Sequence, residues 1–319
     1  MKLSTLRTWI AAAVVALAGP ASAYSDLFVF GDSLSDSGNV AALIGTNPGQ
    51  VITGNGYIPS APYGSGTFSD GHTWVDGLAS ALGVPTGPSL LGGGNYAFGG
   101  AQTRDQSGGS PSLRTQVGLF LGDVGGVASS DALYVLAGGG NNARAALEAV
   151  AGGAPIGQTV LAAALNYAFD IGRMVDQLQA AGATDIIVWN TPNLGLAPAI
   201  IDAGPDATFL GQTVATVMNN ALARRLQGEA GVQIFDLYGL IGSVVADPAG
   251  YGLANVADAC GAIAGCDPAT YLFWDGIHPT SAGQAIIANA MITTAVPEPG
   301  TWALFAAGGL VLMLRRRRD

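Results

Sequence analysis

The chain has 319 residues, of which 49% are apolar and only 11% are charged, so it can bury a sizeable core but carries less than half the usual share of charge. The formal net charge is −10, and residues 24–296 hold 20 acidic side chains against six arginines. Such an acidic body repels phosphate backbones, which argues against nucleic acid as a partner.

Residues 1–23 have the three parts of a secretory signal peptide in the correct order. Lys2 and Arg7 supply the positive start, Trp9–Ala18 is apolar, and Ala21-Ser22-Ala23 forms an A-x-A cleavage site. We therefore expect removal by signal peptidase and export of the rest of the chain.

Four short apolar runs follow, each ending at a cluster of glycine or asparagine. They are continuous rather than alternating, which is typical of strands buried on both faces in a parallel sheet. The sequence predicts these strands at Leu27–Phe30, Ala132–Ala137, Asp185–Trp189 and Val232–Phe235.

Helical patterns separate the predicted strands. The apolar residues of 74–82 share one face, the alanine-rich stretch Gln158–Ala181 stops at Gly182, and Thr213–Ala230 closes with Gly231. Strands that alternate with helices predict parallel βαβ units and an α/β domain. The segment Ile44–Ser69, rich in Gly, Pro and Tyr, is expected to form a long surface loop or lid that contributes walls to a substrate pocket.

The first apolar run leads directly into Gly31-Asp32-Ser33-Leu34-Ser35-Asp36-Ser37-Gly38-Asn39. Gly31 permits a sharp turn, and Ser35 or Asp36 can cap a following helix. Ser33 would then expose its hydroxyl at a strand-to-helix junction, where a helix N-terminus favours a developing oxyanion. A serine of this kind is also a common turn residue.

Asn141 and Asn193 follow the second and third runs just as Ser33 follows the first. Ligands bind beyond the carboxyl ends of the strands in open parallel sheets. We therefore expect these three polar side chains to converge at one edge of the sheet.

The chain contains only two histidines, His72 and His278. Neither has a partner at H-E-x-x-H spacing, and the G-x-S-x-G motif is absent. Gly138–Ala143 fits a dinucleotide-binding pattern, but no acidic residue stands about 20 positions later. We therefore expect no metal and no organic cofactor, and we interpret His72 as structural.

Near the C-terminus, Asp275 precedes His278 by three residues. Pro279 keeps His278 out of a helix, and Thr280 or Ser281 can cap a helix that runs to about Ile292. If the loop turns, the carboxylate can fix the imidazole tautomer and stabilise the imidazolium. The alternative is an ordinary loop carboxylate and a surface histidine.

Four blocks in order resemble the GDSL/SGNH hydrolase family: Gly31–Asn39, Asn95–Ala101, Gly139–Asn142 and Trp274–Pro279. The similarity extends from residue 26 to about 292. It implies a three-layer α/β/α sandwich with a central parallel sheet, flavodoxin-like, over residues 24–295.

The same resemblance implies that Ser33 is a nucleophile assisted by His278 and Asp275. It also implies an oxyanion hole built from the N–H groups of Ser33 and Gly100 and from the Asn141 amide. Gly99, one residue before Gly100, is the neighbouring candidate for this backbone donor. Asn142 departs from the family pattern, which has aspartate there.

The expected function is an exported serine hydrolase of the esterase or lipase type that cleaves small-molecule or lipid carboxylic esters through an acyl-enzyme. Two alternatives use the same fold. One is a surface-displayed binding or matrix protein without activity, and the other is an acyltransferase that uses the same serine.

The C-terminal 24 residues, 296–319, have the layout of a sorting signal. Val296-Pro297-Glu298-Pro299 precedes the apolar run Trp302–Leu314, four arginines and Asp319. This resembles the PEP-CTERM signal of Gram-negative bacteria. The resemblance implies an exosortase-like partner, transient membrane anchoring and delivery to the cell envelope, the cell surface or the medium.

Export also bears on the two cysteines, Cys260 and Cys266. An oxidising compartment favours a disulfide between them, and closing so short a loop would contribute about 2 kcal/mol. Two free thiols are the alternative.

Overall fold

A computed structural model describes residues 24–296, so the predicted signal peptide and nearly all of the predicted sorting segment lie outside the described residues. Four strands form a parallel sheet in the order β1-β2-β3-β4. All four apolar runs form strands, as predicted. Their bounds are Leu27–Gly31 for β1, Leu133–Ala137 for β2, Asp185–Trp189 for β3 and Val232–Phe235 for β4.

A further stretch, residues 94–98, runs along the free edge of β1. Val29 donates its N–H to the Gly94 carbonyl over 3.0 Å, and Tyr96 donates to the Val29 carbonyl over 2.7 Å. Val29 and Asn95 thereby form a parallel bridge. Taken in chain order with the four strands, this gives the spatial order 2-1-3-4-5 of a flavodoxin-like sheet.

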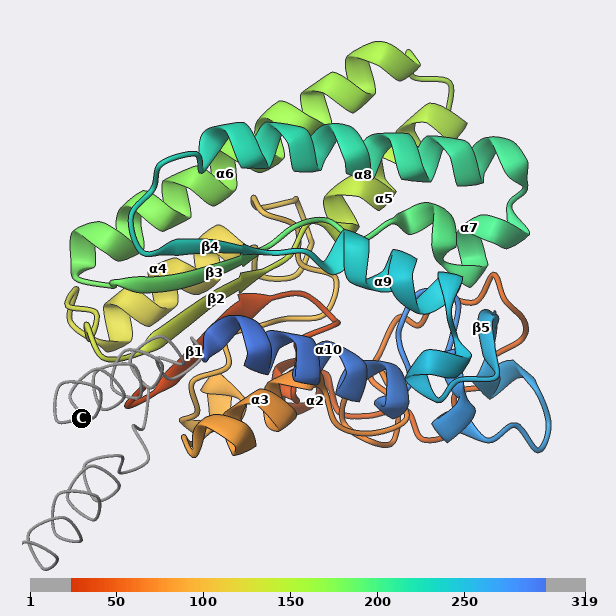
Figure 1. The fold of residues 1–319 in the computed structure, drawn as a ribbon, viewed down its shortest axis with the longest axis horizontal. Coiled ribbons are helices and arrows are strands. Elements are labelled where there is room, and N and C mark those ends of the chain that lie inside the picture. The colour runs from red at the N-terminus through yellow and green to blue at the C-terminus, as the bar shows by residue number, and fades with distance from the viewer. Residues whose placement is uncertain (1–23, 297–319) are drawn as a thin grey trace, which may run out of the picture.

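Helices cover both faces of the sheet. Helices α4, α5, α6 and α8 lie over one face, and α3, α9 and α10 over the other (Figure 1). The α-helices of residues 24–296 are α2 (Asn39–Ile44), α3 (Trp74–Leu82), α4 (Leu113–Asp123), α5 (Gly140–Ala151), α6 (Ile156–Ala181), α7 (Pro198–Asp202), α8 (Pro205–Arg225), α9 (Leu237–Ala246) and α10 (Ser281–Ala295).

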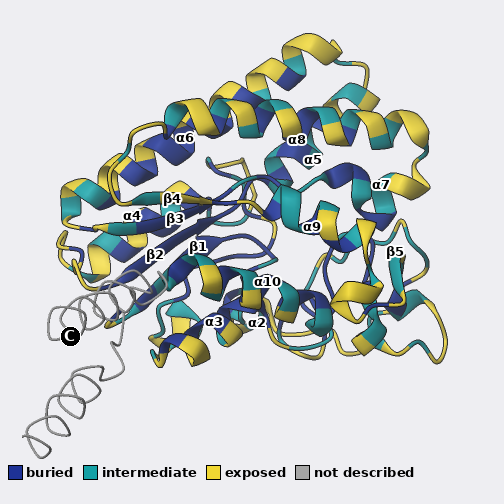
Figure 2. Cartoon of the chain, viewed as in Figure 1, coloured by how far each residue is buried: buried dark blue, intermediate teal, exposed yellow. Residues whose placement is uncertain are grey.

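Each strand supplies both cores because successive side chains point to opposite faces. Tyr134 and Leu136 of β2 join the core under α4, α5, α6 and α8, whereas Leu133 and Val135 join the core under α3, α9 and α10. Strands β1, β2 and β3 are accordingly buried between the helical layers, whereas the edge strand β4 exposes Gln233 and Ile234 (Figure 2). The predicted three-layer α/β/α sandwich with a central parallel sheet is confirmed.

The predicted helix bounds were accurate for α3 and α6 but wrong for α8. That helix begins at Pro205, eight residues earlier than predicted, since proline is pre-organised for the first helical turn. It ends at Arg225 and leaves Gly231 outside. Gly231 instead has a φ of 69°, and a Cβ there would lie 1.9 Å from the Thr184 carbonyl oxygen. Residue 231 must therefore be glycine, because the chain passes close to Thr184 as it enters β4.

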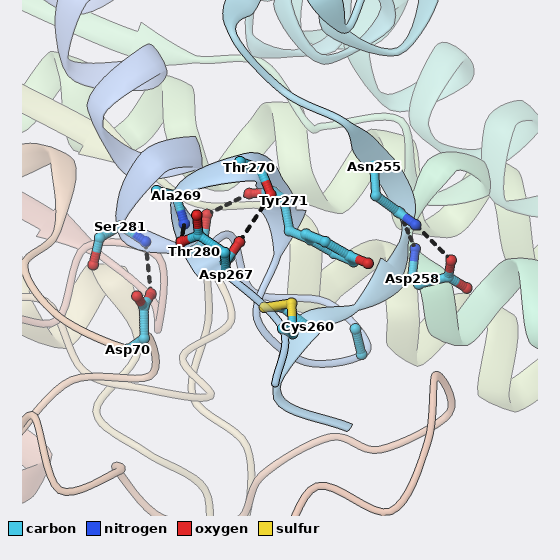
Figure 3. Close-up of a disulfide and its surroundings, with 12 residues drawn as sticks. Asp70, Asn255, Asp258, Cys260, Asp267, Ala269, Thr270, Tyr271, Thr280 and Ser281 are labelled. Atoms are coloured by element: carbon cyan, nitrogen blue, oxygen red, sulfur yellow. Dashed lines mark hydrogen bonds between the residues drawn. A yellow bond between two sulfur atoms is a disulfide. The ribbon is translucent and has the colours of Figure 1, made fainter. Parts of the chain in front are cut away.

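A small second sheet pairs β5 (Asn255–Ala259) with β6 (Tyr271–Phe273). Between them, Cys260 and Cys266 are joined in a disulfide (Figure 3). The Gly261 N–H donates to the Trp274 carbonyl over 2.9 Å. The loop closed by this disulfide therefore supports the chain immediately before Asp275.

Candidate active site

Ser33 lies in a turn directly after β1. Gly31 ends the strand and must be glycine, because a Cβ there would lie 2.6 Å from the Ala137 carbonyl oxygen of β2. The Asp32 carbonyl then accepts the N–H groups of Ser35 and Asp36, each over 3.0 Å. This turn holds Ser33 at the carboxyl edge of the sheet.

The turn continues for longer than predicted, because α2 begins only at Asn39. The Asp36 carboxylate accepts the N–H of Asn39 over 2.7 Å and that of Val40 over 3.3 Å. Asp36 therefore satisfies the start of α2, as predicted. The helix N-terminus, however, lies six residues beyond Ser33 rather than next to it.

His278 connects Ser33 to Asp275. The imidazole Nε2 lies 2.8 Å from the Ser33 Oγ, and Nδ1 lies 2.8 Å from the Asp275 Oδ2. All three residues are buried: Ser33 is 8% exposed, His278 3% and Asp275 0%. A hydroxyl, an imidazole and a carboxylate thus form one continuous, buried hydrogen-bonded line.

The Asp275 carboxylate is held on both oxygens. Oδ1 accepts the backbone N–H groups of Ile277 and His278 over 2.9 and 2.8 Å. Oδ2 accepts the Tyr63 hydroxyl over 2.7 Å. This is the turn that the spacing of Asp275 and His278 required.

The His278 loop is also anchored to its own helix. Thr280 caps α10 through the Gly283 N–H, as predicted. Asp70 accepts the Ser281 N–H over 2.6 Å (Figure 3). The loop is therefore fixed on both sides of the histidine.

Two residues behind the carboxylate and imidazole were missed by the sequence interpretation, Tyr63 and Phe68. Burial and the neighbouring Asp275 carboxylate raise the pKa of Tyr63, so its hydroxyl stays protonated and remains a donor. The Phe68 ring lies 5.5 Å from the His278 ring, centroid to centroid. Both come from the segment expected to be a surface loop or lid, which here packs against the back of the site.

The backbone near residue 100 separates the two glycine candidates for an oxyanion donor. The Gly99 N–H is already committed to the Asp36 carboxylate over 2.9 Å. Within residues 24–296, no acceptor takes the N–H of Gly100 or that of Ser33. The chain geometry therefore favours Gly100 over Gly99.

Asn141 stands at the start of α5, just after β2. One hydrogen of its amide is donated to the Ala101 carbonyl over 3.0 Å, which ties the second block to the third. A side-chain amide carries two donor hydrogens, so one remains for a ligand. Ser33, Asn141 and Asn193 line the same pocket, and Asn193 Oδ1 is occupied by the Gly195 N–H.

Asn142, where the family pattern has aspartate, makes use of both ends of its amide. Its Oδ1 accepts the Thr103 N–H over 3.1 Å, and its Nδ2 donates to the Thr103 Oγ1 over 3.0 Å. The Thr103 hydroxyl in turn donates to the buried Asp170, which also pairs with Arg104. An aspartate at 142 would compete with Asp170 for that hydroxyl, whereas asparagine supplies the missing donor.

His72 does not line this pocket. Its side chain is exposed, and its Nδ1 lies 3.5 Å from the Asp76 carboxylate. Among the residues that the structure describes, no three His, Cys, Asp or Glu side chains gather to hold a metal ion.

Asp32 is the least expected charged group of the site. It is 3% exposed, and burial raises the pKa of its carboxyl to about 6, although the Leu34 N–H and the charges of His278 and Arg144 oppose the shift. Between about pH 4 and pH 6, the folded protein therefore keeps a proton on Asp32 that the unfolded chain has released.

This shift predicts a stability effect for Asp32→Asn. A folded-state pKa above the usual 3.8 means that stability falls as pH rises from about 4 to 6, by up to about 3 kcal/mol. Asparagine can still accept from Leu34 but has no charge to bury. We expect the variant to lose less free energy of unfolding than the wild type between pH 4 and pH 7, measured by denaturant titration. The exposed Asp131→Asn is the control, and an equal loss in D32N and wild type would contradict the prediction.

Comparison with known proteins identifies two matching models. The GDSL-like lipase/acylhydrolase model matches residues 27–291, and the PEP-CTERM protein-sorting motif matches residues 295–318. No helix within residues 24–296 is long and apolar enough to cross a membrane.

Similar proteins occur in bacteria and plants. The esterase EstA of Pseudomonas aeruginosa is 31% identical over 84% of this chain and 46% of its own length. An uncharacterized Pseudomonas putida protein from the trpE-trpG intergenic region is 31% identical over 89% of this chain and 50% of its own. GDSL esterase/lipase At1g29660 of Arabidopsis thaliana is 27% identical over 82% of this chain and 85% of its own length. The chain thus spans about half the length of these bacterial relatives.

Proposed function

Because this chain belongs to the GDSL-like lipase/acylhydrolase family, we propose that it is an exported serine hydrolase that cleaves carboxylic esters. The observation that carries the proposal is the line from the Ser33 Oγ through both nitrogens of His278 to Asp275, with contacts of 2.8 Å on each side of the ring. Geometry of this kind is what a serine needs to become a nucleophile.

In the first half-reaction, the Ser33 oxygen attacks the ester carbonyl while His278 Nε2 takes the hydroxyl proton. The tetrahedral intermediate collapses, the bond to the alcohol oxygen breaks, and Nε2 returns the proton to that oxygen. Asp275 holds Nδ1–H toward itself and stabilises the imidazolium. In the second half, water attacks the acyl carbon and gives a proton to the same nitrogen. The bond from the acyl carbon to the Ser33 oxygen then breaks, Nε2 returns the proton to that oxygen, and the acid is released.

The oxyanion of each tetrahedral intermediate is assigned to three donors, the N–H groups of Ser33 and Gly100 and the free hydrogen of the Asn141 amide. Donors aimed at a developing charge in a site shielded from water stabilise the transition state more than the ground state.

Replacing Asn141 with alanine is therefore expected to lower kcat by about 10²–10³, with a much smaller effect on KM. Steady-state kinetics on a p-nitrophenyl ester provide the measurement. Asn193→Ala is the matched control, since it removes an asparagine from the same pocket whose oxygen is already engaged by Gly195. A rise in KM at unchanged kcat would remove Asn141 from this role.

Covalent labelling tests the function directly. An alkyl fluorophosphonate should modify the protein once, at Ser33, and abolish hydrolysis of short p-nitrophenyl esters, because only an activated serine reacts. A protein that resists the label and hydrolyses nothing would instead be a non-catalytic surface or matrix protein. Labelling without hydrolysis, together with transfer of acyl groups to an added alcohol, would identify an acyltransferase.

The remaining parts of the chain fit export to the cell surface. The PEP-CTERM motif implies processing by an exosortase. We assign residues 1–23 to a signal peptide removed by signal peptidase, 24–295 to the hydrolase domain and 296–319 to sorting and transient membrane anchoring. The protein would then act in the envelope, on the surface or in the medium of a Gram-negative bacterium.

A further inference from the structure

A pocket opens beside Ser33 and His278, and it is also lined by Ile277 and Pro279, the neighbours of His278. It contains a cavity of about 80 Å³. Its inner wall is hydrocarbon contributed by six side chains from distant parts of the fold: Leu34, Leu194, Leu237, Ile241, Phe273 and Ile287. All but the partly buried Leu34 belong to the buried cores. The wall is therefore a fixed part of the domain rather than a mobile loop.

No residue of the segment Ile44–Ser69 lines this pocket, in contrast to the expectation from sequence. Helices α9 and α10 provide the wall instead, through Ile241 and Ile287. The physical reason is that the tight packing of Tyr63 and Phe68 behind Asp275 and His278 commits that segment to the other side of the triad.

The polar and apolar groups of the pocket are distributed unequally. The side chains that α9 and α10 contribute to the lining, Leu237, Ile241 and Ile287, are all hydrocarbon. The polar side chains of the lining come from other parts of the chain: Asp32, Ser33, Asn141, Arg144, Asn193 and His278. A ligand that places an ester carbonyl beside Ser33, His278 and Asn141 would extend an apolar group along the hydrocarbon wall.

The order of the two half-reactions decides which part of an ester fits such a wall. The alcohol departs first and must be replaced by water, so it needs an open path to solvent. The acyl group stays bonded to Ser33 through both steps. A recess with a largely apolar lining suits the group that stays.

Building on the serine hydrolase function, we propose that this pocket is the acyl-binding site and that it selects short acyl chains. A cavity of about 150 Å³ lined by similar side chains holds the six carbons of benzene, so 80 Å³ corresponds to roughly three carbons beyond the carbonyl. The preferred acyl group is then close to butanoyl, and chains of eight carbons exceed the recess.

A panel of p-nitrophenyl esters from acetate to octanoate tests the size of the pocket. We expect kcat/KM to rise by about 10-fold or more from acetate to butanoate and to fall again by octanoate. A profile that is flat, or that keeps rising to octanoate, would overturn the proposal.

Ile241 provides variants that change the pocket in opposite directions. Ile241→Trp should reduce the butanoate-to-acetate ratio of kcat/KM by about 10-fold. Ile241→Ala should lengthen the recess and raise the hexanoate-to-butanoate ratio. Leu240→Trp is the matched control, because it alters the same helix at a partly buried position that does not line the pocket. An unchanged ratio in the Ile241→Ala protein would overturn the proposal even if the tryptophan variant fails to fold.

Acetate esters of linear alcohols, from methanol to octanol, distinguish the two halves of the substrate. The dependence of kcat/KM on alcohol length should be the same in the Ile241→Ala protein as in the wild type. A changed dependence on alcohol length, with the acyl series unchanged, would assign the pocket to the alcohol. Hydrolysis of acetate esters by the wild type distinguishes a failure of the acyl-site proposal from a failure of the hydrolase proposal. If turnover is present with no chain-length effect of Ile241, only the acyl-site proposal fails. If no ester is turned over, the hydrolase function fails.

Discussion

Replacing Ser33 with alanine should lower kcat for ester hydrolysis on the order of 10⁶-fold, close to the loss of the whole triad. The oxygen removed is the one proposed to form the acyl-enzyme, and within residues 24–296 no other hydroxyl contacts His278 Nε2. What rate remains would come from the oxyanion donors and from substrate binding, which act on a water molecule without a covalent step.

The Ser33 experiment depends on a folded variant. The Ser33 side chain bonds only to His278 among the contacts found within residues 24–296, so its loss leaves the turn made by Asp32 and Asp36 in place. Thermal unfolding and circular dichroism of S33A should therefore match the wild type. A folded S33A protein that hydrolyses p-nitrophenyl butanoate at the wild-type rate would contradict the nucleophile assignment.

Asp275→Asn should lower kcat by about 10⁴-fold without unfolding the loop. Oδ1 accepts two backbone N–H groups, so the asparagine oxygen must take that position. Its NH₂ group would then face the ring nitrogen Nδ1 and the Tyr63 hydroxyl. A donor opposite Nδ1 moves the ring proton to Nε2, and Nε2 can no longer accept the proton of Ser33.

The matched control for Asp275 is Tyr63→Phe. It removes a donor from the same carboxylate and keeps both the charge and the packing against Trp274, so its effect on kcat should be far smaller. Steady-state kinetics across a pH series, with thermal unfolding as a check on folding, provide the measurement. Activity of D275N within 10-fold of the wild type would show that Asp275 does not set the tautomer.

The strands and the candidate catalytic residues could be predicted from the sequence because the signals that mark them are local. Residues 186–189 are all apolar because both faces of the strand are covered, and β3 spans Asp185–Trp189 as predicted. Pro279 and Thr280 fix the end of the His278 loop through their own backbone preferences. Helix α8 shows where local reasoning fails. The predicted helix began at Thr213, whereas the helix begins at Pro205. Gly231 was interpreted as the end of the helix, but it is glycine because the chain passes close to Thr184 as it enters β4.

What the sequence determined by itself, then, is the order of strands and helices, the identity of Ser33, Asp275 and His278 as candidates, and the sorting motif at the C-terminus. Only the tertiary structure showed that Tyr63 holds Asp275 across 212 positions of chain, and that core side chains such as Ile241 form the pocket wall. The reason is physical: a strand, a turn or a cap depends on neighbours in the chain, whereas a pocket wall depends on which distant helices pack together over one sheet.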